Sequence, residues 1–253
     1  MRTRWTIPVL CVGVLTACGG GNSQKPAANL AGNWQIIMDG NIKAPSGFLL
    51  QSGTSLDGDF LVSGNCSGVG PAQGQLDGLN IAMTVNASDQ TLSFTGTTTS
   101  EGTSMSGNYS FLGSGCGGSE AGTWTGTQIP ALNTNFQGTF TSGDTPGLVF
   151  HFSGTLSQGS NTGASYATLS GNMISTDAPC FTSASVSGQI SGTAVVLNLT
   201  NSEGIALGKI TTTLTTDVTS MTGTYAFVNF TVPIACGSDF GNVVFTLTPS
   251  STM

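Results

Sequence analysis

The chain has 253 residues, of which only 7% are charged, and its 5 basic and 12 acidic side chains give a formal net charge of −7. Nucleic-acid binding depends on Lys and Arg that neutralise phosphates, so this balance excludes that class and also disfavours electrostatic docking on anionic lipid. The 37 glycines stand among short alternating runs of Val, Ile, Thr, Phe and Leu, which disordered chains lack. We therefore expect a folded, all-β, extracytoplasmic protein.

Residues 1–17 have the pattern of a secretory signal peptide. Arg2 and Arg4 form a short basic region, and the apolar stretch 5–15 follows. The sequence Leu15-Thr16-Ala17-Cys18 then resembles the lipobox of bacterial lipoproteins, a family in which the peptide is cut before the cysteine and this cysteine carries lipid, including palmitate. The alternative is an ordinary secretory signal with an incidental cysteine.

A lipid on Cys18 implies a membrane anchor, because each buried CH₂ contributes about 0.8 kcal/mol. The polar residues 18–29 are expected to form a flexible tether. Gly19 stands where inner-membrane members of the lipoprotein family carry Asp, so the resemblance implies the outer membrane. The mature chain keeps Lys25, Lys43 and Lys209 against the 12 acids, which gives 3 − 12 = −9.

Ordered landmarks recur along the chain and indicate an internal duplication. TSMSGNYSF at 103–111 returns as TSMTGTYAF at 219–227, and GQLDG at 74–78 returns as GQISG at 188–192. The same comparison matches Gly122-Thr123-Trp124-Thr125 with the 243–246 region. We predict two domains, 30–128 and 132–249, with a linker at 129–131 and a tail at 250–253.

Each half contains short alternating runs bounded by Gly, Asn, Asp, Ser or Pro, which is the pattern of consecutive strands. In the first half we expect strands at 33–39, 47–52, 59–65, 73–78, 80–86, 91–98, 104–112 and 121–128. In the second half we expect them at 135–141, 147–157, 165–174, 183–191, 194–200, 205–215, 220–230 and 241–248. Eight strands with tight connections in each half predict an up-and-down antiparallel barrel.

Alternation assigns the inner face. It places Met105, Gly107, Tyr109 and Phe111 inward, and Trp124 and Tyr225 likewise. Trp34 and Trp124 lie in the first and last strands of the first half, which become neighbours only if the sheet closes.

The opening Gly32-Asn33-Trp34 and the final Gly122-Thr123-Trp124 resemble the calycin superfamily of lipocalins and avidin-type proteins. The resemblance implies two tandem eight-stranded barrels and carries over no ligand residues. The alternative fold is a pair of immunoglobulin-like sandwiches.

Four cysteines remain once Cys11 leaves with the signal and Cys18 takes lipid. Four cysteines allow three pairings, and the duplication favours one bridge within each half. We predict Cys66–Cys116 and Cys180–Cys236, each closing a loop of about 50 residues that contributes about 4 kcal/mol in the chain-entropy model. The spacing of a zinc site is absent, so we expect no metal.

Residues that could carry chemistry are few. His151 is the only histidine and alternation turns it outward between Phe150 and Phe152, as for a solvated surface residue. Asp57 and Asp59 are the closest pair of carboxylates, and the sequence around Gly58 favours a hairpin turn. We therefore expect no catalytic residue, no enzyme activity and no cofactor.

Glu120 and Asp239 each follow the second cysteine of their half, in CGGSE and CGSD. They could cap turn amides or belong to a shared binding site. With the inward side chains, the candidate binding residues are Glu120, Asp239, Tyr109, Trp124 and Tyr225. A hollow lined by Phe94, Met105, Tyr109 and Trp124 would hold a small ligand, whereas a filled barrel would not.

These patterns favour a non-catalytic binding module, lipid-anchored at the outer membrane and facing the periplasm or the surface. Its partner would be a small apolar molecule, a glycan or a protein. The alternative is a structural or adhesion lipoprotein of the cell envelope.

Overall fold

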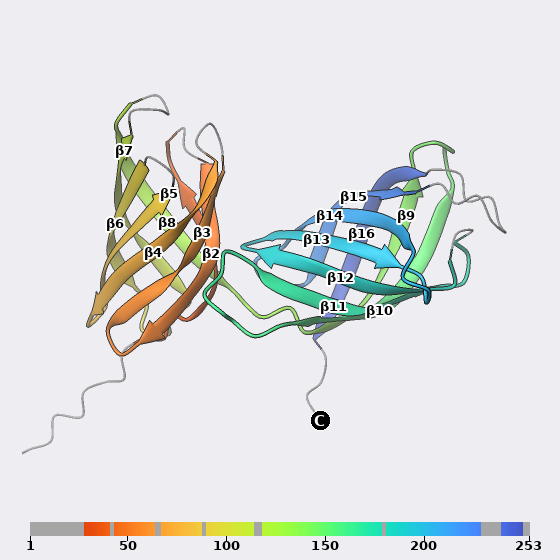
Figure 1. Ribbon diagram of the computed structural model, residues 1–253, viewed down its shortest axis with the longest axis horizontal. Coiled ribbons are helices and arrows are strands. Elements are labelled where there is room, and N and C mark those ends of the chain that lie inside the picture. Colours follow the sequence, from red (N-terminus) through yellow and green to blue (C-terminus); the bar gives the residue numbers. More distant parts are fainter. Residues whose placement is uncertain are drawn as a thin grey trace, which may run out of the picture.

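The computed structural model describes residues 28–40, 43–63, 67–87, 90–113, 118–178, 181–228 and 239–249. The sixteen strands form two closed eight-stranded antiparallel barrels, one after the other along the chain (Figure 1). This confirms the all-β fold of tandem barrels and overturns the alternative of two immunoglobulin-like sandwiches. The architecture is consistent with the calycin resemblance.

The first barrel consists of β1 (Gly32–Met38), β2 (Lys43–Ser52), β3 (Ser55–Ser63), β4 (Gly68–Asp77), β5 (Asn80–Ala87), β6 (Gln90–Thr98), β7 (Ser104–Gly113) and β8 (Glu120–Ile129). The second consists of β9 (Thr134–Ser142), β10 (Val149–Gln158), β11 (Ala167–Ser175), β12 (Ser183–Ser191), β13 (Ala194–Thr200), β14 (Ala206–Leu214), β15 (Ser220–Phe227) and β16 (Phe240–Pro249). Within each barrel, strands that follow one another in the chain pair antiparallel.

Closure of both sheets follows from the pairing of their first and last strands. β1 pairs with β8, with Met38 opposite Trp124, and β9 pairs with β16, with Thr134 opposite Pro249. Closure leaves no free strand edge within the described strands, and an edge is where other chains add by backbone pairing.

The interior of each barrel is its hydrophobic core, as the alternation predicts. Met105, Tyr109 and Phe111 on β7 are buried, and so are their counterparts Met221 and Tyr225 on β15. Each barrel has a cluster of buried apolar side chains, and the cluster of the second barrel also includes Phe48 and Ile129 from the first. The outer faces carry mainly Ser, Thr, Asn and Gln.

Inward glycines make room for aromatic rings. Gly96 and Gly107 face each other across β6 and β7, and a Cβ on Gly107 would lie 1.9 Å from the carbonyl oxygen of Thr95. The Trp124 indole N–H donates to the carbonyl oxygens of Thr95 and Asn108, at 3.3 and 3.2 Å. The glycines therefore allow close backbone approach beneath the indole ring, as expected for glycine in a curved sheet.

The duplication extends over the whole barrel and includes the segment before its first strand. Leu30 and Leu132 are both fully buried, and their N–H groups donate to Gln51 and Gln158 at 2.6 and 3.0 Å. Pairing with Tyr109 and Tyr225 makes Gly122 equivalent to Gly241. The counterpart of Trp124 is therefore Val243, and the match of 122–125 with 243–246 is wrong by two residues.

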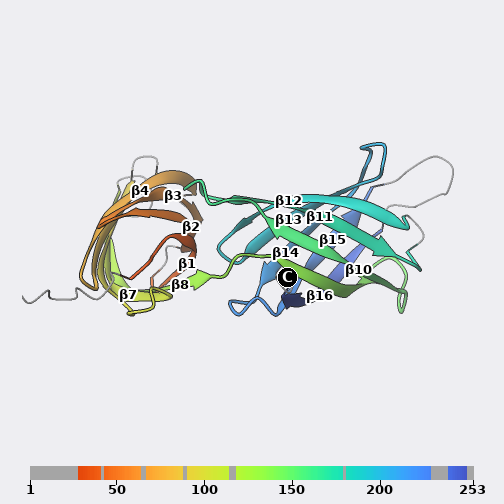
Figure 2. The same ribbon diagram turned by 90° about the horizontal axis from the view of Figure 1, so that it is seen from below.

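One end of the second barrel rests on the side of the first (Figures 1 and 2). The side-chain amide of Asn33 donates to the carbonyl oxygen of Gly192 at 2.8 Å, and the N–H of Gly192 donates back to Asn33 Oδ1 at 2.7 Å. Beside this pair, Ser46 Oγ and Ser191 Oγ lie 2.8 Å apart. The N–H and hydroxyl of Thr193 both donate to Gln35 Oε1, each at 3.2 Å.

A loop and an aromatic ring complete this joint between the barrels. Asn161 Nδ2 donates to the carbonyl oxygen of Leu49 at 2.7 Å, and the N–H of Asp59 donates to the carbonyl oxygen of Gly163 at 2.6 Å. Phe48 projects from the first barrel into the hydrophobic cluster of the second and is 2% exposed. The two barrels are therefore held together by buried contacts in addition to the covalent linker.

Candidate functional site

The inward residues predicted to line a hollow in the first barrel are packed against one another. Phe94 and Trp124 meet edge to face with ring centroids 5.3 Å apart, and Phe94, Met105, Tyr109 and Trp124 are each 1–3% exposed. A hollow large enough for a ligand would leave accessible area on the side chains that line it, because water would also fit there. Tyr109 and Trp124 therefore belong to a filled core.

The second barrel is filled by a cluster of aromatic rings. Phe140 lies 4.4 Å from Phe152 and 4.7 Å from Tyr225, centroid to centroid. Phe245 lies 4.9 Å from Phe152 and 5.3 Å from Phe136. Since edge-to-face and tilted pairs of this kind pack at core density, Tyr225 also belongs to a core.

Four of the five predicted binding residues form two equivalent pairs, one in each barrel. Tyr109 donates its phenol proton to Glu120 Oε1 at 2.6 Å, and Tyr225 donates to Asp239 Oδ2 at 2.6 Å. Burial, followed by the hydrogen bond and the charge of the carboxylate, raises the pKa of both phenols well above the ordinary value. Each carboxylate thus accepts the hydrogen bond of a tyrosine hydroxyl at the edge of a barrel core.

A residue difference at one position, just after β1 in the first barrel and at the end of β9 in the second, compensates for the different lengths of the two acids. A Cβ on Gly40 would collide with the Glu120 carboxylate and the Tyr109 hydroxyl. The position equivalent to Gly40 beside the shorter Asp239 is Ser142, because Ser142 faces Gly241. Ser142 Oγ donates to Asp239 Oδ1 at 2.7 Å. Both barrels thus have a tyrosine–carboxylate hydrogen bond at this end, although the residues around it differ. This indicates that the bond is a structural requirement of the barrel end.

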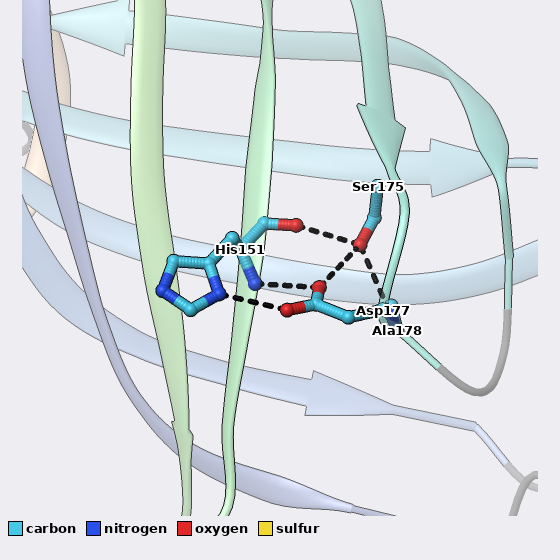
Figure 3. A network of polar contacts seen from close by, with 4 residues as sticks. All are labelled: His151, Ser175, Asp177 and Ala178. Carbon is cyan, nitrogen blue, oxygen red and sulfur yellow. Dashed lines mark hydrogen bonds and ion pairs between the residues drawn. The ribbon is translucent and has the colours of Figure 1, made fainter.

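His151 is outward as predicted, but it is paired (Figure 3). Its Nδ1 lies 2.7 Å from Asp177 Oδ2, its backbone N–H donates to Asp177 Oδ1 at 2.8 Å, and its side chain is 69% exposed. These hydrogen bonds hold the pKa of Asp177 below its ordinary value. Twenty-six residues separate the two, so no local signal in the sequence could have found the pair.

Ser175 completes this network but does not face the ring of His151. Its hydroxyl donates to the carbonyl oxygen of His151 at 2.6 Å, contacts Asp177 Oδ1 at 3.2 Å and accepts from the N–H of Ala178 at 3.0 Å (Figure 3). In a nucleophile–base arrangement the hydroxyl would instead bond to the second ring nitrogen. The network therefore fixes the β11 end against β10.

An open depression of about 500 Å³ lies beside this network on the outer face of the second barrel. Its lining combines hydroxyl, amide and apolar side chains from four strands: Gln137, Thr139, His151, Ser153, Ile174, Val244 and Thr246 among them. The depression therefore lies outside the barrel and not in its interior.

Asp57 and Asp59 lie within β3 and not in a hairpin turn, so that prediction is wrong. The turn is formed four residues earlier, at Gly53 and Thr54, where Gly53 has φ +60°. Both aspartates line a second depression, of about 360 Å³, at the joint between the barrels. Among the described residues no group of three or more His, Cys, Asp or Glu side chains is arranged to hold a metal ion.

Cys18 and the predicted bridges Cys66–Cys116 and Cys180–Cys236 lie outside the described residues and stay predictions. No helix within the described ranges has the length and apolar character needed to cross a membrane. The sequence matches no protein-family model, and a search of curated proteins finds no match either.

Proposed function

We propose that this chain is a lipid-anchored, non-catalytic structural or adhesive protein of the bacterial envelope, and that it binds a protein partner through the outer faces of its barrels. The observation that carries the proposal is the filled interior of both barrels. With the inward aromatic residues almost fully buried, a small apolar ligand would have to displace core side chains. The filled interiors therefore favour a partner on the outer faces over a small apolar ligand inside a barrel.

The joint between the barrels supports a protein partner over a glycan. There, outward polar side chains of β1 and β2 bind the backbone of a turn, with Asn33 contacting both polar groups of Gly192. An outer face of this chain can thus recognise protein backbone. Because the sheets are closed, such recognition must use side chains rather than an added strand.

The anchor rests on Leu15-Thr16-Ala17-Cys18 and is tested separately. Cells that express the full chain are labelled with a clickable palmitate analogue, and membranes are then fractionated. We expect label on the protein and recovery with the outer membrane, with both lost in Cys18→Ser. Label that persists in Cys18→Ser would refute lipidation at this residue.

The site of binding is tested by native mass spectrometry of the protein released from membranes. We expect the mass of the lipidated chain without a stoichiometric small molecule. A bound apolar molecule that survives gentle desolvation and is lost on unfolding would refute binding on the outer faces and restore the barrel-ligand hypothesis.

A further inference from the structure

The joint between the barrels uses different surfaces on its two sides. The first barrel contributes a docking face made of Asn33, Gln35 and Ser46. The second contributes a docking turn, Ser191–Thr193, which connects β12 to β13. Because the barrels are copies of one another, each barrel should also carry the counterpart of the surface that its sister uses. An interface of this heterologous kind can repeat without closing.

The second barrel repeats the docking face residue by residue. Gln35 faces Ser46 across β1 and β2, and Gln137 faces Ser153 across β9 and β10. Asn33 precedes Gln35 by two residues, as Asn135 precedes Gln137. The second docking face is therefore Asn135, Gln137 and Ser153, with the same three residue types in the same register.

This second face is uncovered in the monomer. Asn33 is 2% exposed within the joint, whereas Asn135 and Gln137 are exposed. Gln137 and Ser153 line the depression of about 500 Å³ on the outer face. A concave surface thus lies at the position where the first barrel receives a turn.

The first barrel carries an unused docking turn. Asp77, Gly78 and Leu79 connect β4 to β5 as Ser191–Thr193 connects β12 to β13. Gly78 has φ +61° and Gly192 has φ +55°, so the two turns share a backbone conformation that glycine adopts without strain. No atom lies within 4 Å of a Cβ built on Gly78, and Leu79 is 42% exposed.

We propose that the docking face Asn135–Gln137–Ser153 binds the Asp77–Leu79 turn of a second copy of this chain, so that molecules join head to tail. The side-chain amide of Asn135 would contact the backbone of Gly78, and Gln137 would accept from the N–H of Leu79. Ser153 would donate to the Asp77 carboxylate, where the internal joint pairs two serines. The inference rests on the proposed function only in placing the binding surface outside the barrels.

The joint between molecules is expected to be weaker than the joint within one. Thr155 stands in the second barrel where the first has Phe48, so the aromatic insertion is missing. The connection between β2 and β3 is only Gly53 and Thr54, so it cannot supply contacts like those of Asn161 and Gly163. Assembly should therefore need high local concentration, which anchoring to a surface provides.

The test uses the full chain in cells, with the photo-crosslinking substitution Leu79→p-benzoylphenylalanine. Irradiation should give a ladder of covalent multimers, and peptide mass spectrometry should place the crosslink on β9 or β10 of a second copy. The ladder should be lost in Asn135→Ala/Gln137→Ala and kept in Thr141→Ala, an exposed position on β9 outside the docking face. The same probe at Leu112, which is 64% exposed at the other end of the barrel, should give no ladder.

A monomer under all conditions, crosslinks only to other proteins, or a ladder that survives Asn135→Ala/Gln137→Ala would each overturn head-to-tail assembly. None of these results bears on whether a small molecule occupies a barrel. The mass spectrometry and the crosslinking therefore fail independently.

Discussion

The buried hydrogen bonds between Asn33 and Gly192 give the sharpest stability prediction. Asn33→Ala removes two hydrogen bonds of 2.8 and 2.7 Å without touching either barrel core, because this side chain points outward from β1. Each such bond contributes about 1 kcal/mol, and a buried N–H or C=O without a partner costs about 1–3 kcal/mol. Water entering the vacated space restores part of this loss. We expect the free energy of unfolding of the joined barrels to fall by about 2 kcal/mol.

Tryptophan fluorescence measures this loss in the first barrel alone. Of the three tryptophans, Trp5 lies in the predicted signal and Trp34 and Trp124 lie in the first barrel. With a dependence of about 2 kcal/mol per molar urea, the fluorescence midpoint should fall by about 1 M. Far-ultraviolet circular dichroism, followed in parallel, shows whether the second barrel still unfolds in the same transition.

Asn135→Ala is the matched control, since Asn135 is the equivalent residue and is exposed. At concentrations too low for assembly, its free energy of unfolding should stay within about 0.5 kcal/mol of the wild-type value, as for an ordinary surface substitution. An unchanged midpoint in Asn33→Ala, or an equal loss in both variants, would refute the view that the joint couples the barrels.

Three further predictions follow from the same contacts. In urea denaturation, Gly192→Ala should lower the free energy of unfolding more than Gly78→Ala does. The Cβ on residue 192 would lie 2.3 Å from Gln35 Oε1, whereas a Cβ on residue 78 meets nothing. Equal losses would mean that both variants suffer only backbone strain, and would contradict a tight contact at Gly192. The raised pKa values of Tyr109 and Tyr225 imply that stability is complete below pH 10.0, the ordinary tyrosine value, and falls as the pH rises above it. Denaturation midpoints measured against pH should therefore decline less steeply in Tyr109→Phe/Tyr225→Phe, and an identical slope would contradict the assignment. Gly107→Ala should lower the thermal midpoint sharply or prevent folding, because backbone atoms block its Cβ, and a variant as stable as the wild type would show that β6 and β7 can separate.

Much of the fold was predictable because it depends on local periodicity. Alternation on β7 predicted that Met105, Tyr109 and Phe111 are inward. The two tryptophans on the first and last strands predicted closure, which β1 and β8 provide. Asp57 was assigned wrongly because Asp–Gly sequences favour turns, whereas here the outer face of β3 accepts them beside the joint.

The candidate site was less predictable, since its partners are distant in sequence. The sequence shows that Glu120 and Asp239 share a place after a cysteine, and the fold shows that each accepts a hydrogen bond from a tyrosine on β7 or β15. His151 and Asp177 meet because β10 and β11 are paired, and neither residue has a neighbour in sequence that signals this.

The strand period, the inward face, the duplication and the predicted lipid signal all follow from the order of the residues alone. These are local properties, which a short window of residues contains. The contacts that the two copies make depend instead on how the barrels pack. The same Asn, Gln and Ser are buried against a turn in one barrel and exposed in the other, because the barrels pack side against end. That asymmetry arises from docking two similar bodies through unlike surfaces, so identical residues acquire different environments.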